Sequence, residues 1–249
     1  MSIEIKDLHK AFGENEVLRG FSLDVHEGET LVILGQSGSG KSVTIKHIVG
    51  LLEPDAGEVW VDGEEVGALA REELYELRRK VGYVFQFAAL FDSMTIFENV
   101  AMGLRRMGGL GRGEIEERVR DSLARVDMEE LSDRYPAEIS GGQRKRAGIA
   151  RAIATRPKYL LYDEPTTGLD PITKAVIDRL IIRMADDLDV TGIVITHDME
   201  SAYRVGDRTA MLYEGRARFL GTMDELKNTD DPVVRGFIEG RPELLENAS

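Results

Sequence analysis

The chain has 249 residues, of which 42% are hydrophobic and 31% are charged, and this length suits one large domain or one core with an inserted lobe. It contains no cysteine, which excludes disulfides and thiolate metal sites. Its net charge of −13 argues against broad electrostatic binding to nucleic acid or to anionic lipid.

The N-terminal part of the chain is predicted to be rich in β-strands. Apolar and polar residues alternate, or nearly so, over residues 3–5, 21–25 and 58–61. Residues 31–34 are apolar throughout, which indicates a short buried strand. Turn sequences at 26–29 and 62–63 separate these strands.

The segment after the buried strand fits the pattern G-x-x-x-x-G-K-[ST] without a mismatch. Glycines can adopt torsions that let backbone amides curl around phosphate oxygens. A helix predicted over residues 42–49 would point the positive end of its dipole at the anion. The alternative is a glycine-rich turn that holds no ligand. The motif residues are Gly35, Gln36, Ser37, Gly38, Ser39, Gly40, Lys41 and Ser42.

The types of residue in this motif predict nucleotide binding. Lys41 is expected to reach the β- and γ-phosphates, and the Ser42 hydroxyl is expected to ligate Mg²⁺. Thr44, in the first turn of the following helix, is assigned to the same nucleotide site.

The rest of the chain alternates predicted helices and strands. Helical patterns cover residues 71–80, 96–106, 114–126, 144–155 and 173–185, and strand patterns cover 81–85, 159–162, 193–196 and 209–213. Four glycines between 108 and 113 are predicted to form a mobile loop. Alternating strands and helices imply a largely parallel sheet that is covered on both faces.

Two acids follow the apolar strand at 159–162 and narrow the prediction to hydrolysis. Asp163 and Glu164 are adjacent, so strand alternation points them in different directions. Asp163 is expected to orient on Mg²⁺ or its water shell, and Glu164 is expected to polarise the attacking water. A solvated acidic pair at a strand end is the alternative.

A glycine pair upstream of the acidic strand indicates the family. Residues 139–143 read Ile-Ser-Gly-Gly-Gln and precede a predicted helix. With the phosphate loop, Gln86, the acidic pair, residues 168–170 and His197 in this order, the chain closely resembles the ATPase subunit of ABC transporters over residues 1–230. In that family the Ser-Gly-Gly-Gln segment completes the ATP site of the opposite subunit. The resemblance assigns this role to Ser140, Gly141, Gly142 and Gln143.

Further roles follow from the resemblance. Gln86 resembles the glutamine that contacts Mg²⁺ and the attacking water, and His197 resembles the switch histidine that touches the γ-phosphate. Asp170 resembles the aspartate that communicates across the dimer. Phe12 stands where the family has an aromatic residue, more often tyrosine, that stacks on adenine. The basic run 144–146 is predicted to be a solvated helix face, and no nucleic acid is expected as a partner.

The resemblance implies an α/β fold of the P-loop NTPase (RecA-like) type. It predicts a parallel-sheet core with an N-terminal antiparallel β subdomain over residues 1–86 and 155–229. A helical subdomain would be inserted at 87–154, and residues 230–249 would form a C-terminal tail. The cofactors are expected to be ATP and Mg²⁺, held between two copies of the chain.

Three stretches narrow the resemblance to the ATPases of Mla-type phospholipid transporters, which act in envelope lipid asymmetry. They are residues 89–93, 170–173 and 231–240. The apolar segment 85–100 suits a partner's coupling helix. The expected partners are an integral membrane permease and a substrate-binding lipid carrier. The predicted location is the cytoplasmic face of the inner membrane, where the protein is peripheral.

Two other functions stay open. One is a polar amino-acid importer ATPase, whose core motifs are nearly the same. The other is an ABC ATPase without a membrane partner, although such chains usually carry a second cassette or a long coiled-coil insertion. A degenerate nucleotide-binding scaffold would need a broken motif, and every motif here is intact.

Overall fold

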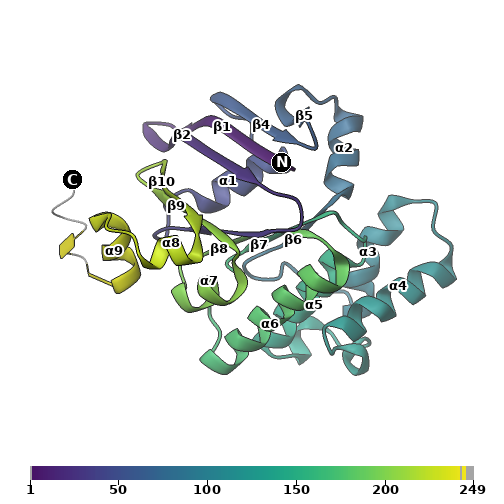
Figure 1. The fold of residues 1–249 in the computed structure, drawn as a ribbon. Helices are drawn as coiled ribbons and strands as arrows, with labels where there is room; N and C mark the ends of the chain where they lie inside the picture. Colours follow the sequence, from purple (N-terminus) through teal and green to yellow (C-terminus); the bar gives the residue numbers. More distant parts are fainter. Residues whose placement is uncertain (1, 242, 245–249) are drawn as a thin grey trace. The chain divides into compact units, whose positions relative to one another are not determined.

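A computed structural model of the chain describes residues 2–241, 243 and 244. It divides into two compact units, coloured along the chain in Figure 1. The first unit extends to Leu74 and resumes at Ile193, and the second unit is Tyr75–Gly192. The second unit is therefore inserted into the first, and the chain re-enters the first unit within strand β8 (Thr191–Thr196).

An antiparallel sheet forms the N-terminal part of the first unit. Strand β1 (Ile3–Phe12) pairs with β2 (Asn15–Val25) on one side and with β4 (Ala56–Val61) on the other. The short β5 (Glu64–Glu65) extends the sheet at β4, so the order is β2-β1-β4-β5. The β1–β2 hairpin is longer than the sequence pattern predicts, because its outer half has few buried residues to mark the alternation.

The parallel strands of the first unit lie around β3 (Thr30–Leu34), which is buried at every residue. Strand β9 (Arg208–Tyr213) is parallel to β3 on one side, and β8 is its neighbour on the other. Strand β10 (Arg216–Thr222) pairs antiparallel with β9. A continuous apolar run such as β3 is typical of a strand covered on both faces.

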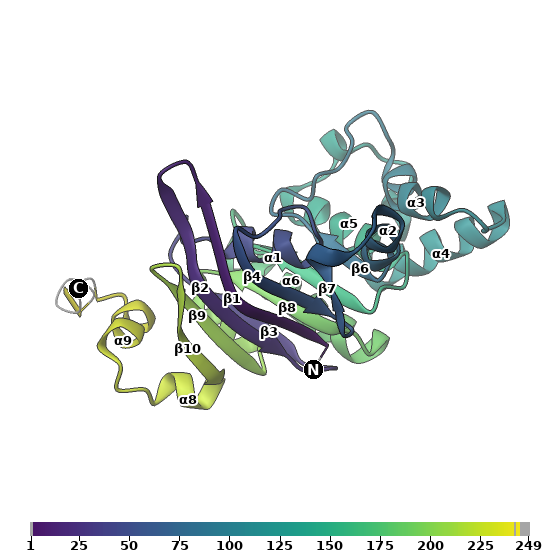
Figure 2. The same cartoon turned by 90° about the horizontal axis from the view of Figure 1, so that it is seen from above.

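Helices follow these strands. Helix α1 (Lys41–Ile48) comes after β3, and α7 (Met199–Val205) comes after β8. Two short helices end the described chain, α8 (Met223–Lys227) and α9 (Pro232–Glu239), and Figure 2 shows α8 beside β10. Residues 242 and 245–249 of the predicted tail lie outside the described residues.

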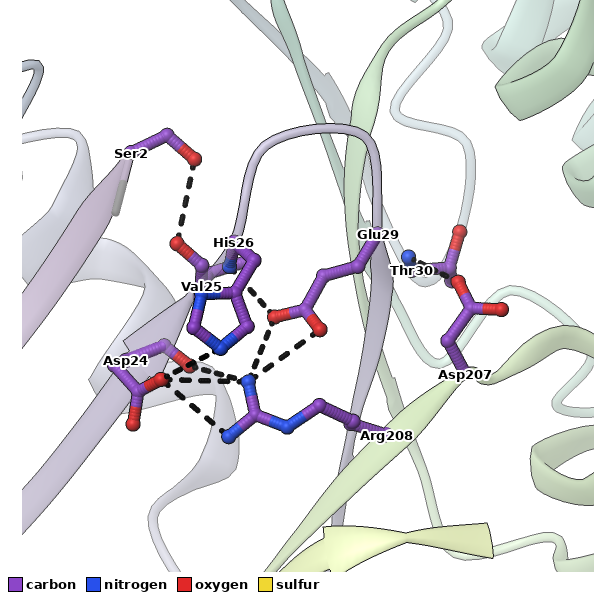
Figure 3. Close-up of polar contacts among 8 residues, drawn as sticks. All are labelled: Ser2, Asp24, Val25, His26, Glu29, Thr30, Asp207 and Arg208. Carbon is purple, nitrogen blue, oxygen red and sulfur yellow. Dashed lines mark hydrogen bonds and ion pairs between the residues drawn. The ribbon is translucent and has the colours of Figure 1, made fainter.

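A polar cluster ties the β2–β3 turn to β9 within the first unit (Figure 3). The Arg208 guanidinium lies 3.0 Å from Oε1 of Glu29 and 3.3 Å from Oδ2 of Asp24. Glu29 also accepts a 2.6 Å hydrogen bond from the backbone amide of His26, and Asp207 accepts one of 2.8 Å from the amide of Thr30. The carboxylate of Glu29 is buried, so its pairing with Arg208 offsets the cost of removing its charge from water.

The second unit combines a parallel strand pair with a helical group. Strand β6 (Val81–Val84) is parallel to β7 (Tyr159–Asp163), with Tyr83 opposite Leu161. Helices α3 (Ile96–Met107), α4 (Arg112–Arg125) and α5 (Gly141–Ile153) pack against one another, and α5 also contacts α6 (Pro171–Leu188). Helix α2 (Arg71–Arg79) precedes β6.

Most predicted elements are present, with small shifts at their ends. The predicted loop at 108–113 is shorter than expected, because Gly113 lies in the first turn of α4. The α-helices and β-strands of the described residues that the sequence analysis did not predict are β5, α7, β10, α8 and α9. The division at 87–154 and 230 stays a prediction. Among the described residues, no helix is long and apolar enough to cross a membrane.

Candidate functional site

The phosphate-loop motif forms a tight turn between β3 and α1 in the first unit. Gly38 and Gly40 have positive φ angles, of 79° and 104°. A Cβ at Gly35 would lie 2.6 Å from the carbonyl oxygen of Leu212, and one at Gly40 would lie 2.7 Å from Val17. Both positions therefore need glycine for close packing and, at Gly40, for its torsion.

The charged and hydroxyl groups of this loop fit a phosphate ligand. Lys41 is buried, and its ammonium donates hydrogen bonds to the carbonyls of Gly35 and Gln36 at 2.8 and 2.9 Å. The Ser39 hydroxyl is buried and makes no hydrogen bond to any described residue. A buried hydroxyl without a partner, beside a loop of glycines at a helix N-terminus, suits an anion with several acceptor oxygens.

Phe12 ends β1 as an accessible ring. Its side chain is 49% exposed, and the ammonium of Lys10 lies 5.8 Å from the ring centroid. Lys10 is itself fixed by a 2.7 Å ion pair with Asp55. A half-exposed aromatic face can stack on a flat heterocycle, as the sequence predicts for adenine.

His197 lies at the carboxyl end of β8 and is exposed. Its neighbour Asp198 caps α7 by accepting hydrogen bonds from the amides of Glu200 and Ser201, at 3.0 and 3.2 Å. The Asp198 amide in turn donates to the Thr196 hydroxyl at 2.9 Å. The backbone on both sides of His197 is therefore fixed while its imidazole is accessible.

Asp163 and Glu164 end β7 in the second unit, and both are buried. Oδ2 of Asp163 accepts a 3.2 Å hydrogen bond from the Tyr83 hydroxyl. Oε2 of Glu164 accepts a 3.0 Å hydrogen bond from the Thr167 hydroxyl. Each carboxylate thus has its own hydroxyl partner, which supports the prediction of separate roles for the two acids.

The backbone of Glu164 adopts a conformation that is unusual for its residue type. Its φ angle is +49°, in the left-handed region, which costs a non-glycine residue about 1–2 kcal/mol. Such torsions persist where surrounding contacts hold them, and they are frequent at functional sites. The Thr167 amide donates to the Glu164 carbonyl at 3.3 Å, which closes the turn.

Gln86 follows β6 and is half-buried. Its backbone carbonyl accepts a hydrogen bond from the ammonium of Lys145, and this same ammonium donates to the Glu164 carbonyl at 3.2 Å. Gln86 and Glu164 are 78 residues apart in sequence, yet one side chain of α5 binds the main chain of both. The structure therefore brings these two predicted site residues together.

The predicted signature segment forms the N-terminus of α5. Ser140 is the N-cap, and it exchanges hydrogen bonds with Gln143 in a capping box, at 3.2 Å and 2.8 Å. A Cβ at Gly142 would lie 2.5 Å from the Cγ2 methyl group of Thr173 on α6. This glycine is therefore required by packing within the chain, a reason that the sequence analysis did not give.

Asp170 caps α6. Its carboxylate accepts hydrogen bonds from the amides of Ile172 and Thr173, and from the Thr173 hydroxyl at 2.5 Å. These bonds, led by the one from the Thr173 hydroxyl, lower the pKa of Asp170. The role across a dimer that the family resemblance gives to Asp170 stays a prediction.

The prediction of a solvated basic face at residues 144–146 holds for the exposed Arg144 but is wrong for Lys145. Arg144 donates to the carbonyls of Pro136 and Ile139, and Arg146 donates to those of Val126 and Asp127. Lys145 is only 6% exposed. Burial lowers the pKa of its ammonium to about 8, although the Glu164 and Asp163 carboxylates act in the opposite direction.

The predicted residues thus fall into two groups. The first unit holds Phe12, the phosphate loop, Thr44 and His197, and the second holds Gln86, the signature segment, Asp163 and Glu164. Sequence reasoning missed Tyr83 and Lys145. Both lack a motif, although Lys145 shares the helical spacing of the buried residues Ile149 and Ala152, which is a signal for burial.

The sequence analysis predicts Mg²⁺ as the metal of the nucleotide site. The ion commonly takes one or two protein ligands and completes its shell with water and substrate phosphates. Among the described residues there is no group of three acids or histidines that could hold a metal alone. Asp163, the Ser42 hydroxyl and Gln86 are the oxygen ligands that the sequence analysis assigns to Mg²⁺, and this assignment stays a prediction.

Comparison with known proteins identifies the family. The family model described as ABC transporter matches residues 18–167. The probable ribonucleotide transport ATP-binding protein mkl of Mycobacterium leprae is 39% identical over 241 residues, which are 97% of this chain and 70% of that protein. The chloroplastic protein TRIGALACTOSYLDIACYLGLYCEROL 3 of Arabidopsis thaliana is 39% identical over 256 residues, covering 96% of this chain and 73% of that protein. A methionine import ATP-binding protein, MetN of Carboxydothermus hydrogenoformans, is 43% identical over 218 residues, covering 87% and 64%.

Solved structures agree. The dimeric ATP-binding cassette MJ0796, in a post-hydrolysis state with ADP and Pi bound, matches with a TM-score of 0.81 and 33% identity, covering 89% of this chain and 98% of that one. The cbiO1 protein of Clostridium perfringens, part of the cbiONQ transporter complex, matches with a TM-score of 0.83 and 29% identity, covering 98% of both chains.

These matches confirm the predicted fold class, an α/β P-loop NTPase with an antiparallel and a parallel sheet. They also confirm the predicted enzyme class and cofactors, since cassettes of this kind hydrolyse ATP with Mg²⁺. Cassettes of the family form dimers and pair with membrane permeases. The chain belongs to the ABC transporter family and is its ATP-binding, ATP-hydrolysing subunit.

Proposed function

We propose that Glu164 activates the water that attacks the γ-phosphate of ATP. The supporting observation is a buried carboxylate at the end of β7 whose backbone is held in a left-handed turn and whose Oε2 is oriented by Thr167. Asp163, Gln86 and Ser42 bind Mg²⁺, and Lys41 binds the β- and γ-phosphates. His197 contacts the γ-phosphate, and Phe12 stacks on the adenine. Phosphoryl transfer relies mainly on such positioning and charge stabilisation.

We further propose that two copies of the chain close on two ATP molecules. Ser140, Gly141, Gly142 and Gln143 present the N-terminus of α5, which is thirteen residues long and carries no acid in its first turn. The N-terminus of a helix carries the positive end of the helix dipole, so it suits the γ-phosphate of an ATP molecule that is bound to a second copy of the chain. Asp170, at the neighbouring N-terminus of α6, completes this face.

A membrane permease is the proposed partner of the segment after β6. Phe85, Phe87 and Phe91 are 40%, 81% and 49% exposed, on a chain whose net charge is −13. Exposed aromatic residues close together in sequence are typical of a protein interface. The subunit would then be peripheral, at the cytoplasmic face of the inner membrane.

The proposed substrate is phospholipid, transported between membranes of the cell envelope with the help of a lipid carrier protein. The observation that supports this choice is the similarity, over 96% of the chain, to a relative that is named after a galactolipid. The stretches at 89–93, 170–173 and 231–240 resemble Mla-type phospholipid ATPases in sequence.

A polar amino-acid importer is the second candidate. A methionine import ATPase is 43% identical over 87% of the chain, which is a higher identity over a shorter stretch than the lipid-named relative shows. Selectivity in such transporters belongs to partner proteins, so the cassette alone does not distinguish the two substrates.

Extraction of the protein with its native membrane complex tests the proposal. The complex would be purified through a tag on this chain in mild detergent, and its proteins and lipids would be identified by mass spectrometry. Phospholipid with a permease and a lipid carrier supports the phospholipid function. An amino-acid-binding protein replaces it with the second candidate, and the absence of any membrane protein overturns both.

A further inference from the structure

One side of helix α5 contacts the chain segment just after β6. Lys145, Gly148 and Arg151 are spaced three residues apart, so they lie on successive turns of the helix. Lys145 donates to the carbonyl of Gln86, and a Cβ at Gly148 would lie 3.2 Å from the Cβ of Ala88. Arg151 donates to the carbonyls of Ala88 and Ala89, at 2.7 and 2.5 Å.

This segment needs such contacts because its backbone is strained. Ala88 and Ala89 have φ angles of +60° and +49°, two consecutive alanines in the left-handed region. This region is unfavourable for any residue with a Cβ atom. The Arg151 guanidinium donates a hydrogen bond to each of these two carbonyls and so holds the strained segment in place.

Lys145 differs from its neighbours on α5 because it binds two separate parts of the chain. Its second hydrogen bond goes to the carbonyl of Glu164, which also has a positive φ angle, of +49°. A buried ammonium without hydrogen-bond acceptors is strongly unfavourable, so these two carbonyls and the ammonium stabilise one another.

We infer that Lys145 is a positioning residue of the ATPase reaction: by binding the carbonyls of Gln86 and Glu164, it sets the placement of their side chains. The inference rests on the proposed roles of these two residues. It also gives α5 a function beyond its N-terminus, since the helix that carries the signature segment fixes the two residues proposed to act on the water.

The test compares Lys145→Met with two other variants. Methionine keeps the length and apolar stem of the side chain and removes its donors, whereas Lys145→Arg keeps donors. Arg146→Met is the matched control. Arg146 also lies on α5 and also donates to two backbone carbonyls, but these belong to Val126 and Asp127 and not to Gln86 or Glu164. Each variant is assayed for kcat, for ATP affinity and for thermal unfolding.

We expect Lys145→Met to lower kcat by about tenfold or more while ATP affinity stays within roughly threefold. Lys145→Arg should recover most of the lost kcat. Arg146→Met should lower the unfolding temperature without a comparable loss of kcat. A Lys145→Met protein with wild-type kcat overturns the inference, and so does one whose kcat falls no more than that of Arg146→Met at equal stability.

Hydrogen exchange gives a readout that is independent of turnover. The variant for this measurement is Lys145→Gln, whose polar side chain is a second choice in case Lys145→Met does not fold. In it, the backbone amides at 86–89 and 164–167 should exchange faster than in the wild type. Amides at 126–128, beside Arg146, should not change. Uniform or absent changes contradict the inference. A Lys145→Met protein with wild-type turnover can then be interpreted with the help of Glu164→Gln. If Glu164→Gln also keeps full turnover, the proposed role of Glu164 fails together with the Lys145 inference. If Glu164→Gln loses turnover, only the Lys145 inference is refuted.

Discussion

The Tyr83 hydroxyl donates a 3.2 Å hydrogen bond to Oδ2 of Asp163, which links β6 to the acidic end of β7. Burial, together with the Asp163 carboxylate, raises the pKa of Tyr83 far above its usual range, so the phenol is a donor at every physiological pH. The Tyr83 hydroxyl binds Oδ2 of Asp163 and not Oδ1. Tyr83 therefore helps to orient the carboxylate that is the proposed Mg²⁺ ligand.

Substitution of Tyr83 by phenylalanine should weaken Mg²⁺ binding. Loss of a residue that orients a metal ligand typically lowers metal affinity about 10–100-fold. The measurement is the Mg²⁺ concentration that gives half-maximal ATPase activity, which should rise in Tyr83→Phe. The matched control is Tyr162→Phe, because the buried Tyr162 hydroxyl makes no hydrogen bond to a described residue. Equal Mg²⁺ curves for the wild type and Tyr83→Phe would refute this role.

The Glu164→Gln variant should separate ATP binding from hydrolysis. Loss of the proposed base should slow hydrolysis about 10²–10⁴-fold while ATP still binds. Size-exclusion chromatography with ATP and Mg²⁺ should then show a shift toward dimer. Glu200→Gln, at an exposed position on α7, is the control and should turn over normally. Near-normal turnover in Glu164→Gln would reject Glu164 as the water-activating residue.

Glycine at position 142 has two proposed reasons, the packing against Thr173 and the approach to nucleotide on a second copy. A double substitution can separate them. In Gly142→Ala the new Cβ meets the Thr173 methyl at 2.5 Å, and overpacking of this kind costs about 1–3 kcal/mol. Thr173→Ser removes that methyl and keeps the hydroxyl that binds Asp170. The double variant should therefore regain stability in urea unfolding. If Gly142 also approaches nucleotide on a second copy, the ATPase activity of the double variant stays low. Full activity of the double variant would exclude that approach.

His47 should make stability depend on pH. Burial on α1 lowers its pKa, and the charge of Lys10 acts in the same direction, while the hydrogen bond to the Val43 carbonyl and Asp55 oppose it. The unfolded chain then binds a proton that the folded chain does not, so stability is full above about pH 6.5 and falls below it. The loss is at most about 1.4 kcal/mol per pH unit.

The variant His47→Gln tests this linkage. Urea unfolding at pH 7.5 and at pH 5.5 should show a smaller loss of stability in the variant than in the wild type. Parallel losses in wild type and His47→Gln would contradict the prediction.

The sequence predicted the elements whose patterns are local. The buried strands β3 and β7 and the phosphate loop each follow from adjacent residues. Strand β10 was missed because it is an edge strand with mostly exposed residues and no clear alternation. Helix α9 was missed within a polar tail, although Asp231 and Pro232 form a typical helix start.

The environment of Lys145 was not predictable in the same way. Its partners are main-chain carbonyls of Gln86 and Glu164, far away in sequence, and any residue type would present the same oxygen. The positive φ angles of Ala88 and Glu164 have no compositional signal either, since neither residue is glycine. Contacts to backbone atoms leave no pattern in a single sequence.

The row of contacts along α5 has a consequence for the diversity of this family. Lys145 and Arg151 donate to carbonyl oxygens of the segment after β6, which any residue type would present, and the Arg151 guanidinium also lies 5.8 Å from the ring centroid of Phe85. Exposed residues such as Phe87 can therefore be exchanged to suit another permease while the path of the main chain is kept. A single ATPase scaffold can in this way acquire a new membrane partner through surface substitutions, without re-evolving its chemistry.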